Sequence, residues 1–182
     1  MKKPVQLRKI FLCTGLATLV LAGCASPPPP AYVQPAPVQY ERGVLLQRID
    51  AVIANAQNNG SLRLATSPDP LVTGQTLQLE LATAQPGYLY LYQVATDGRT
   101  LSLVFPNAID GANYMAAGST RLPRANWQLK AYGPAGTGYL LAVLTPQALN
   151  TLAMQADAPQ GRINLPAPYS AALASLREVA AP

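Results

Sequence analysis

Cys24 is the residue of this chain whose type and surroundings point to a specific chemistry. It follows Leu21, Ala22 and Gly23, so two small residues stand directly before the cysteine. A cysteine thiolate is a nucleophile, and small side chains let an extended backbone enter the narrow cleft of a peptidase. The stretch is therefore expected to be a cleavage site at which the thiol of Cys24 is modified.

The residues before Cys24 have the three zones of an export signal. Four Lys and Arg lie within residues 1–9, an apolar run covers residues 10–22, and small residues follow. The run is shorter than the roughly 20 residues that a membrane-spanning helix needs. Residues 1–23 are therefore predicted to be a signal peptide.

The stretch from Leu21 to Cys24 resembles the lipobox of bacterial lipoproteins. The resemblance implies that Cys24 becomes the first mature residue, with a diacylglycerol on its sulfur and an acyl chain on its amine. Two or more lipid chains anchor a protein stably to a membrane. In such lipoproteins an aspartate after the cysteine favours the inner membrane, and here the next residue is Ala25. The implied location is the outer membrane, facing the periplasm.

Charge and composition exclude several function classes. Four of the 13 Lys and Arg lie in the predicted signal, which leaves nine against eight Asp and Glu. No basic cluster remains, so we expect no nucleic-acid partner. The chain has no histidine and no Gly-x-Ser-x-Gly elbow, so a Ser-His-Asp triad cannot be built. We expect no catalytic residues, no metal and no cofactor. We also expect no disulfide within the mature chain, because Cys24 is its only cysteine.

Two segments precede the predicted domain. Residues 24–40 are rich in proline and are expected to form a stiff extended tether. The alternative is that they are a proline-rich ligand for a partner. Residues 41–59 are predicted to contain an amphipathic helix over 41–57, with Leu45, Ile49 and Val52 on one face.

Residues 60–146 are predicted to form one β-sandwich, because their apolar residues alternate with a period of two. About seven short strands are expected, separated by Pro and Gly turns and by the hairpin signal Asp97-Gly98. The strands at 88–94 and 139–144 are apolar on both faces, so we expect them to be central and covered on each side.

Residues 147–182 are predicted to be a C-terminal loop and helix packed on the sandwich. A short helix is expected at 147–154 and a closing helix at 170–180. The expected fold is thus mainly β, with an N-terminal amphipathic helix and a short C-terminal helix. Among the acids, Glu80 is expected on a polar strand face, and Asp69, Asp97 and Asp110 in turns where carboxylates bond nearby backbone amides.

Tyr88, Tyr90 and Tyr92 form a stripe on one face of the strand at 88–94. One interpretation is that their rings belong to the core, with hydroxyl groups at its rim. The other is that they form an aromatic binding surface for a protein or a glycan. Their solvent exposure distinguishes the two.

A longer series of motifs resembles a known family. It begins with Pro86-Gly87-Tyr88-Leu89-Tyr90-Leu91-Tyr92 and Asp97-Gly98, and continues with Leu103-Val104-Phe105-Pro106-Asn107 and Gly133-Pro134-Ala135-Gly136. Over about residues 62–144 the chain is similar to the domain of unknown function DUF4384. The resemblance implies a β-sandwich of the kind found in envelope lipoproteins and beside signalling or protease-like domains. It assigns no catalytic residues.

These observations lead to two functional hypotheses. The first is a non-enzymatic outer-membrane lipoprotein whose periplasmic sandwich binds another protein in a cell-envelope assembly. A type VI-like secretion-system accessory is one concrete form, by analogy of fold alone. The alternative is a periplasmic binding module for peptidoglycan or a small ligand. An enzyme would require a pair of carboxylates facing a cleft, and the oligomeric state is left open.

Overall fold

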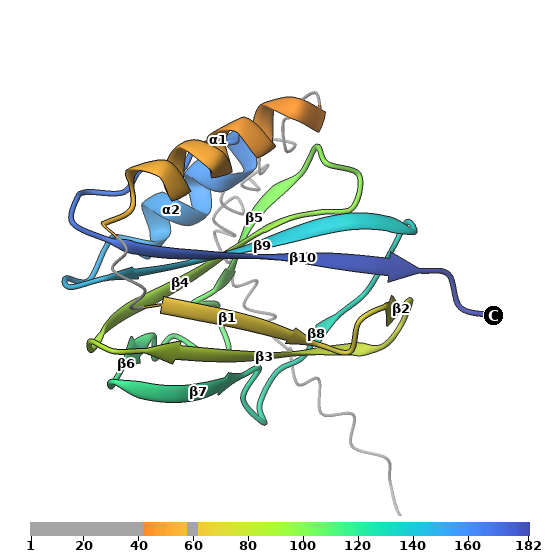
Figure 1. Ribbon diagram of the computed structural model, residues 1–182, viewed down its shortest axis with the longest axis horizontal. Coiled ribbons are helices and arrows are strands. Elements are labelled where there is room, and N and C mark those ends of the chain that lie inside the picture. Colours follow the sequence, from red (N-terminus) through yellow and green to blue (C-terminus); the bar gives the residue numbers. More distant parts are fainter. Residues whose placement is uncertain (1–41, 58–61) are drawn as a thin grey trace, which may run out of the picture. The chain divides into compact units, whose positions relative to one another are not determined.

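The computed structural model describes residues 42–57 and 62–182. In this part of the chain two β-sheets pack face to face, and helices cover the outer side of one of them (Figure 1). The predicted mainly β sandwich with an N-terminal helix is therefore confirmed. The predicted lipobox, Leu21 to Cys24, lies outside the described residues.

The helical layer consists of α1 (Arg42–Asn55), α2 (Thr151–Asp157) and a short 3₁₀ helix, η1 (Ala158–Gln160). Helix α1 confirms the amphipathic prediction, because its buried apolar residues are spaced by three or four positions at Leu45, Ile49 and Val52. Helix α2 begins after Asn150, whose side chain accepts a hydrogen bond from the backbone N–H of Ala153. This N-cap satisfies one of the free donors of the first helical turn.

The smaller sheet is antiparallel and has the strand order β1-β3-β7, with β8 also paired to β3. Its strands are β1 (Leu62–Ser67), β3 (Thr76–Thr83), β7 (Gly118–Leu122) and β8 (Leu129–Lys130). Within β3 the burial alternates, because Leu77, Leu79 and Leu81 are buried whereas Gln78 and Glu80 are exposed. This is the expected pattern of a strand that faces the core on one side only.

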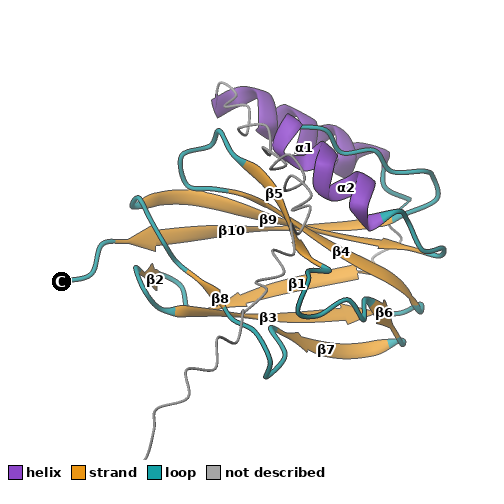
Figure 2. Cartoon of the chain, turned by 180° about the vertical axis from the view of Figure 1, so that it is seen from behind, coloured by secondary structure: helices purple, strands orange, loops and turns teal. Residues whose placement is uncertain are grey.

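The larger sheet has the order β2-β10-β9-β4-β5, and β6 pairs with the start of β4 (Figure 2). The strands are β2 (Leu71–Val72), β4 (Gly87–Val94), β5 (Leu101–Phe105), β6 (Tyr114–Met115), β9 (Gly136–Thr145) and β10 (Ser170–Val179). The pairing of β2 with β10 is parallel and the other pairings are antiparallel.

The larger sheet lies between two apolar clusters. Leu89, Leu91 and Leu140 face the smaller sheet, whereas Leu141 and Val143 face the helices. Strands β4 and β9 are thus buried on both faces, which confirms their predicted central position. No helix in the described part of the chain is long and apolar enough to cross a membrane.

The predicted closing helix at 170–180 is wrong. These residues form β10, which pairs with β9 from Ser170 to Glu178. Alanine, leucine, arginine and glutamate are among the best helix formers, but intrinsic propensity is small compared with tertiary contacts, and the continuous ladder to β9 outweighs it. The short C-terminal helix that packs on the sandwich is α2, three to four residues later than predicted. The sandwich accordingly extends beyond residue 146, and within residues 42–57 and 62–182 it has ten strands rather than about seven.

Candidate interaction surface

One face of the smaller sheet is polar and carries no described element on top of it. Alternate residues of β1, β3, β7 and β8 point away from the core, as the register and the burial pattern show. We call this set the outer face, and its members are Arg63, Ala65, Ser67, Thr76, Gln78, Glu80, Ala82, Ser119, Arg121 and Lys130. Half of these ten side chains are short and four are charged, so the outer face is a polar platform on which long charged groups stand among short side chains.

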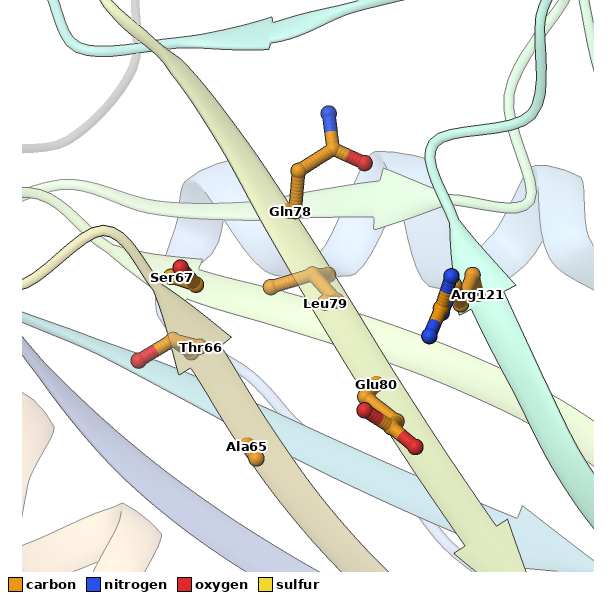
Figure 3. A pocket seen from close by; sticks show the side chains of 7 residues that line it. All are labelled: Ala65, Thr66, Ser67, Gln78, Leu79, Glu80 and Arg121. Carbon is orange, nitrogen blue, oxygen red and sulfur yellow. The ribbon is translucent and has the colours of Figure 1, made fainter.

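Glu80 lies at the centre of the outer face. In the antiparallel register its position is opposite Ala65 on β1 and opposite Arg121 on β7. The three positions border a shallow pocket of about 300 Å³, and Ser67 and Gln78 line it as well (Figure 3). A carboxylate, a guanidinium, an amide and a hydroxyl group are thus available to an incoming molecule from three adjacent strands.

The outer face has a surplus of positive charge. Arg121 lies opposite Glu80 on β7, Arg63 lies opposite Ala82 on β1, and Lys130 lies opposite Thr76 on β8. The side chains of Glu80 and of these three cations are exposed. Among the described residues none of the four makes an ion pair, whereas Arg124, Arg162 and Arg177 each pair with an aspartate. The charges of the outer face are therefore available to a partner.

The aromatic binding surface predicted at Tyr88, Tyr90 and Tyr92 is not present as a stripe. The side chains of Tyr90 and Tyr92 are 0% and 1% exposed and belong to the cluster under the helices. Tyr88 is half-buried and packs edge to face against Tyr114, with ring centroids 5.2 Å apart. The core interpretation holds for two of the three rings, because α1 and α2 cover this face of β4.

The buried tyrosines hold the helical layer to the sheet. The hydroxyl oxygen of Tyr90 accepts a hydrogen bond from the backbone N–H of Leu149 at 2.7 Å, just before α2. The hydroxyl of Tyr169 donates to the carbonyl oxygen of Val52 in α1 at 3.0 Å. Burial raises the pKa of Tyr92, with smaller contributions from the negative charge of Asp157 and from Tyr90. Burial also raises the pKa of Tyr169. The hydroxyl groups of Tyr90 and Tyr169 therefore have a structural role, and burial favours the neutral form of Tyr92 and Tyr169.

A second concave region, of about 720 Å³, runs between α1 and the segment 161–169. Its two cationic side chains already have partners within the chain. Arg48 donates to the carbonyl oxygen of Gly161, and Arg162 donates to the carboxylate of Asp157. Those hydrogen bonds from Arg162, together with one from Asn164, hold the pKa of Asp157 below its usual range. This groove therefore offers a ligand fewer free polar groups than the outer face does.

The other carboxylates behave as structural groups in different ways. Asp97 accepts hydrogen bonds from the backbone N–H groups of Arg99 and Thr100, as predicted for a turn. Asp110 differs from the prediction, because its buried carboxylate accepts hydrogen bonds from the side chains of Arg124 and Trp127. Within the described ranges, no three His, Cys, Asp or Glu side chains gather as they would around a metal ion.

The prediction that Glu80 lies on a polar strand face is confirmed, but the sequence analysis did not predict that Arg63, Arg121 and Lys130 share that face. The available signal was the alternation of polar residues in each strand, such as Arg63 with Ala65 and Ser119 with Arg121. That signal gives the face of each residue within its own strand. It does not give the strand order that brings β1 and β7 to the two sides of β3.

Part of this sandwich matches a known protein family. Residues 71–148 match the sequence model described as Domain of unknown function (DUF4384). No curated protein and no solved structure matches the chain. The matched segment runs from β2 through β9, whereas α1, β1, α2, η1 and β10 lie outside it. Residues 71–148 therefore form a DUF4384 domain, to which the flanking segments add one strand in each sheet and the covering helices.

Proposed function

We propose that this chain is a non-enzymatic lipoprotein of the outer membrane, and that the outer face of its periplasmic sandwich binds another protein of the cell envelope. The proposed anchor is Cys24. A type VI-like secretion system is one assembly that such a protein would serve as an accessory. The proposal rests chiefly on one observation, the free polar platform on β1, β3 and β7, whose charged side chains have no partner among the described residues.

The polarity of the outer face favours a protein over a small molecule. Small-molecule sites are concave, mostly apolar and lined with aromatic rings. The outer face is mostly polar, and its members include no aromatic side chain. Its charged positions are also far apart, because Lys130 lies opposite Thr76 and Arg63 lies opposite Ala82. Thr76 and Ala82 are six residues from each other along β3, about 20 Å at 3.4 Å per residue. A ligand that reaches both ends must be macromolecular.

The second candidate function is a binding module for peptidoglycan or a small ligand. One observation favours it, namely the pocket of about 300 Å³ beside Glu80 and Arg121. This volume lies at the lower end of the range of small-molecule sites, which is about 300–1,000 Å³. Purified sacculi test it, because a glycan module sediments with them and loses this property in E80Q and R121A variants.

In-cell crosslinking tests the first proposal. A photoreactive side chain replaces Gln78 or Ser119 in the full chain, and the matched control replaces Arg99 in the turn between β4 and β5. Both outer-face positions are expected to yield the same protein, identified by mass spectrometry, and Arg99 is expected not to yield it. The reverse experiment, with the photoreactive group in the identified protein, must return this chain. If the three positions give identical products, the proposal is wrong.

The anchor has its own test. A C24S variant lacks the thiol that would accept the lipid, so it is expected to leave the membrane pellet for the soluble periplasmic fraction. An A25S variant serves as a control, because it changes the adjacent residue and keeps the thiol. If C24S still sediments with membranes as the control does, the lipid anchor is refuted.

A further inference from the structure

We infer that the protein bound at the outer face is acidic where it touches this sheet, and that Arg63, Arg121 and Lys130 recognise its carboxylates. This inference rests on the proposed function and adds the chemistry of the partner. It starts from the free charges of the outer face, three positive and one negative, in a domain whose total charge is close to neutral.

The positions of these charges define what a partner must present. Arg63 and Arg121 lie on β1 and β7, the two strands that flank β3, and are offset by two residues along it, so their backbones are about 12 Å apart. Glu80 lies on β3 between them, and Lys130 lies beside Thr76 at the start of the same strand. A complementary surface carries carboxylates spaced over about 10 to 20 Å.

Charge argues against a second copy of this chain as the occupant. A twofold dimer places the same patch on both subunits. Two outer faces in contact would then bring six cations together with only two copies of Glu80, and like charges in contact oppose association. The partner therefore has a different sequence.

Charge density argues against an anionic membrane. Basic segments that bind anionic lipid carry about four to eight Lys or Arg in one cluster. The outer face has three, spread over three strands around a carboxylate that anionic lipid repels. Arginine is also enriched at protein interfaces, where its planar guanidinium forms paired hydrogen bonds with carboxylates.

The test reverses the charges and keeps the fold. In the full chain with the photoreactive group at position 78, we compare R63E/R121E with R99E/R177E, which changes the net charge equally. Arg99 and Arg177 are exposed, and neither belongs to the outer face. The yield of the crosslinked protein is expected to fall about tenfold or more in R63E/R121E and to change less than twofold in the control. Urea unfolding verifies that both variants fold.

Two further measurements identify the chemistry. E80Q is expected to keep or raise the crosslink yield, since it removes the only negative charge of the outer face. Replacing acidic residues of the crosslinked region by lysine is expected to restore binding to R63E/R121E. A yield in R63E/R121E equal to that in the control overturns the inference while the crosslink still supports the proposed function. Failure of position 78 to crosslink any protein in the parent chain refutes the proposed function itself.

Anionic lipid and cell wall are the other ligands that the outer face could bind, and each is tested with a defined probe. The C24S full chain is mixed with vesicles containing about one-third phosphatidylglycerol, or with purified sacculi, and then sedimented. The inference requires that neither probe retains the chain through Arg63 and Arg121. Retention that is lost in R63E/R121E but kept in R99E/R177E assigns the outer face to lipid or to cell wall and overturns the inference.

Discussion

The buried carboxylate of Asp110 accepts a hydrogen bond from Nε1 of Trp127 at 3.0 Å and forms an ion pair with Arg124. Arg124 also donates to the carbonyl oxygen of Ala112 and lies over the ring of Phe105. The rings of Phe105 and Trp127 are stacked, with centroids 6.0 Å apart. This network joins the loop after β5 to the segment between β7 and β8, so it holds these two segments together.

Removal of this carboxylate is predicted to destabilise the domain. D110A leaves the indole N–H and the guanidinium without their acceptor, and we expect the free energy of unfolding to fall by about 2–3 kcal/mol. D110N keeps an acceptor oxygen and should cost less. Urea unfolding followed by fluorescence measures this directly, because Trp127 is the only tryptophan. E80Q is the control, expected within about 0.5 kcal/mol of the parent. Equal stability of D110A and E80Q would refute the prediction.

The tyrosine hydroxyls are predicted to be structural. Y90F removes the acceptor of the Leu149 N–H, and Y169F removes the donor to the Val52 carbonyl. Each change is expected to lower the free energy of unfolding by about 1 kcal/mol. Hydrogen exchange is expected to accelerate around α2 in Y90F and around α1 in Y169F. Y132F alters a side chain that is 84% exposed and should change neither quantity.

The close approach of β4 to β9 predicts a strict requirement for glycine at position 87. A Cβ atom there would lie 2.7 Å from the carbonyl oxygen of Thr145, which is a backbone atom of the paired strand. G87A must therefore move β4 away from β9, and we expect a loss of about 2 kcal/mol. G43A in α1 has no atom within 4 Å of the new Cβ and should be neutral or stabilising. Thermal unfolding of the two variants checks the difference, and a G87A variant as stable as G43A would contradict it.

The pair of Asp157 and Arg162 predicts an acid-dependent loss of stability. Hydrogen bonds from Arg162 and Asn164 lower the pKa of Asp157 in the folded chain. The ionised carboxylate therefore stabilises the fold at pH values above the unfolded aspartate pKa of about 4, and this stabilisation is lost as the pH falls through the lower folded pKa. D157N is expected to be less stable than the parent at pH 7 and to match it at strongly acidic pH. Urea midpoints at several pH values measure the difference, and a pH-independent gap would refute this origin.

Local sequence patterns were sufficient for most strands and for the N-terminal helix. The alternation of Leu77, Leu79 and Leu81 predicted β3, and the Asp97-Gly98 turn predicted the hairpin of β4 and β5. These features succeed because a turn and a one-sided strand depend on neighbouring residues. The same patterns predicted a two-sided burial of β4 but left the role of its tyrosines open, since burial under α1 and α2 depends on residues more than thirty positions away.

The sequence by itself determined the mainly β character, the amphipathic α1, the turns, and the resemblance to DUF4384. Only the tertiary structure decided that residues 170–179 are a strand and that Arg63, Arg121 and Lys130 share one face of the sheet with Glu80. The physical reason is the same in both cases. The backbone partners of β10 lie on β9, and the neighbours of Glu80 lie on two strands separated from β3 in sequence. Pairing between distant strands adds a full ladder of hydrogen bonds and a shared core, and this outweighs the weak helical preference of the segment alone.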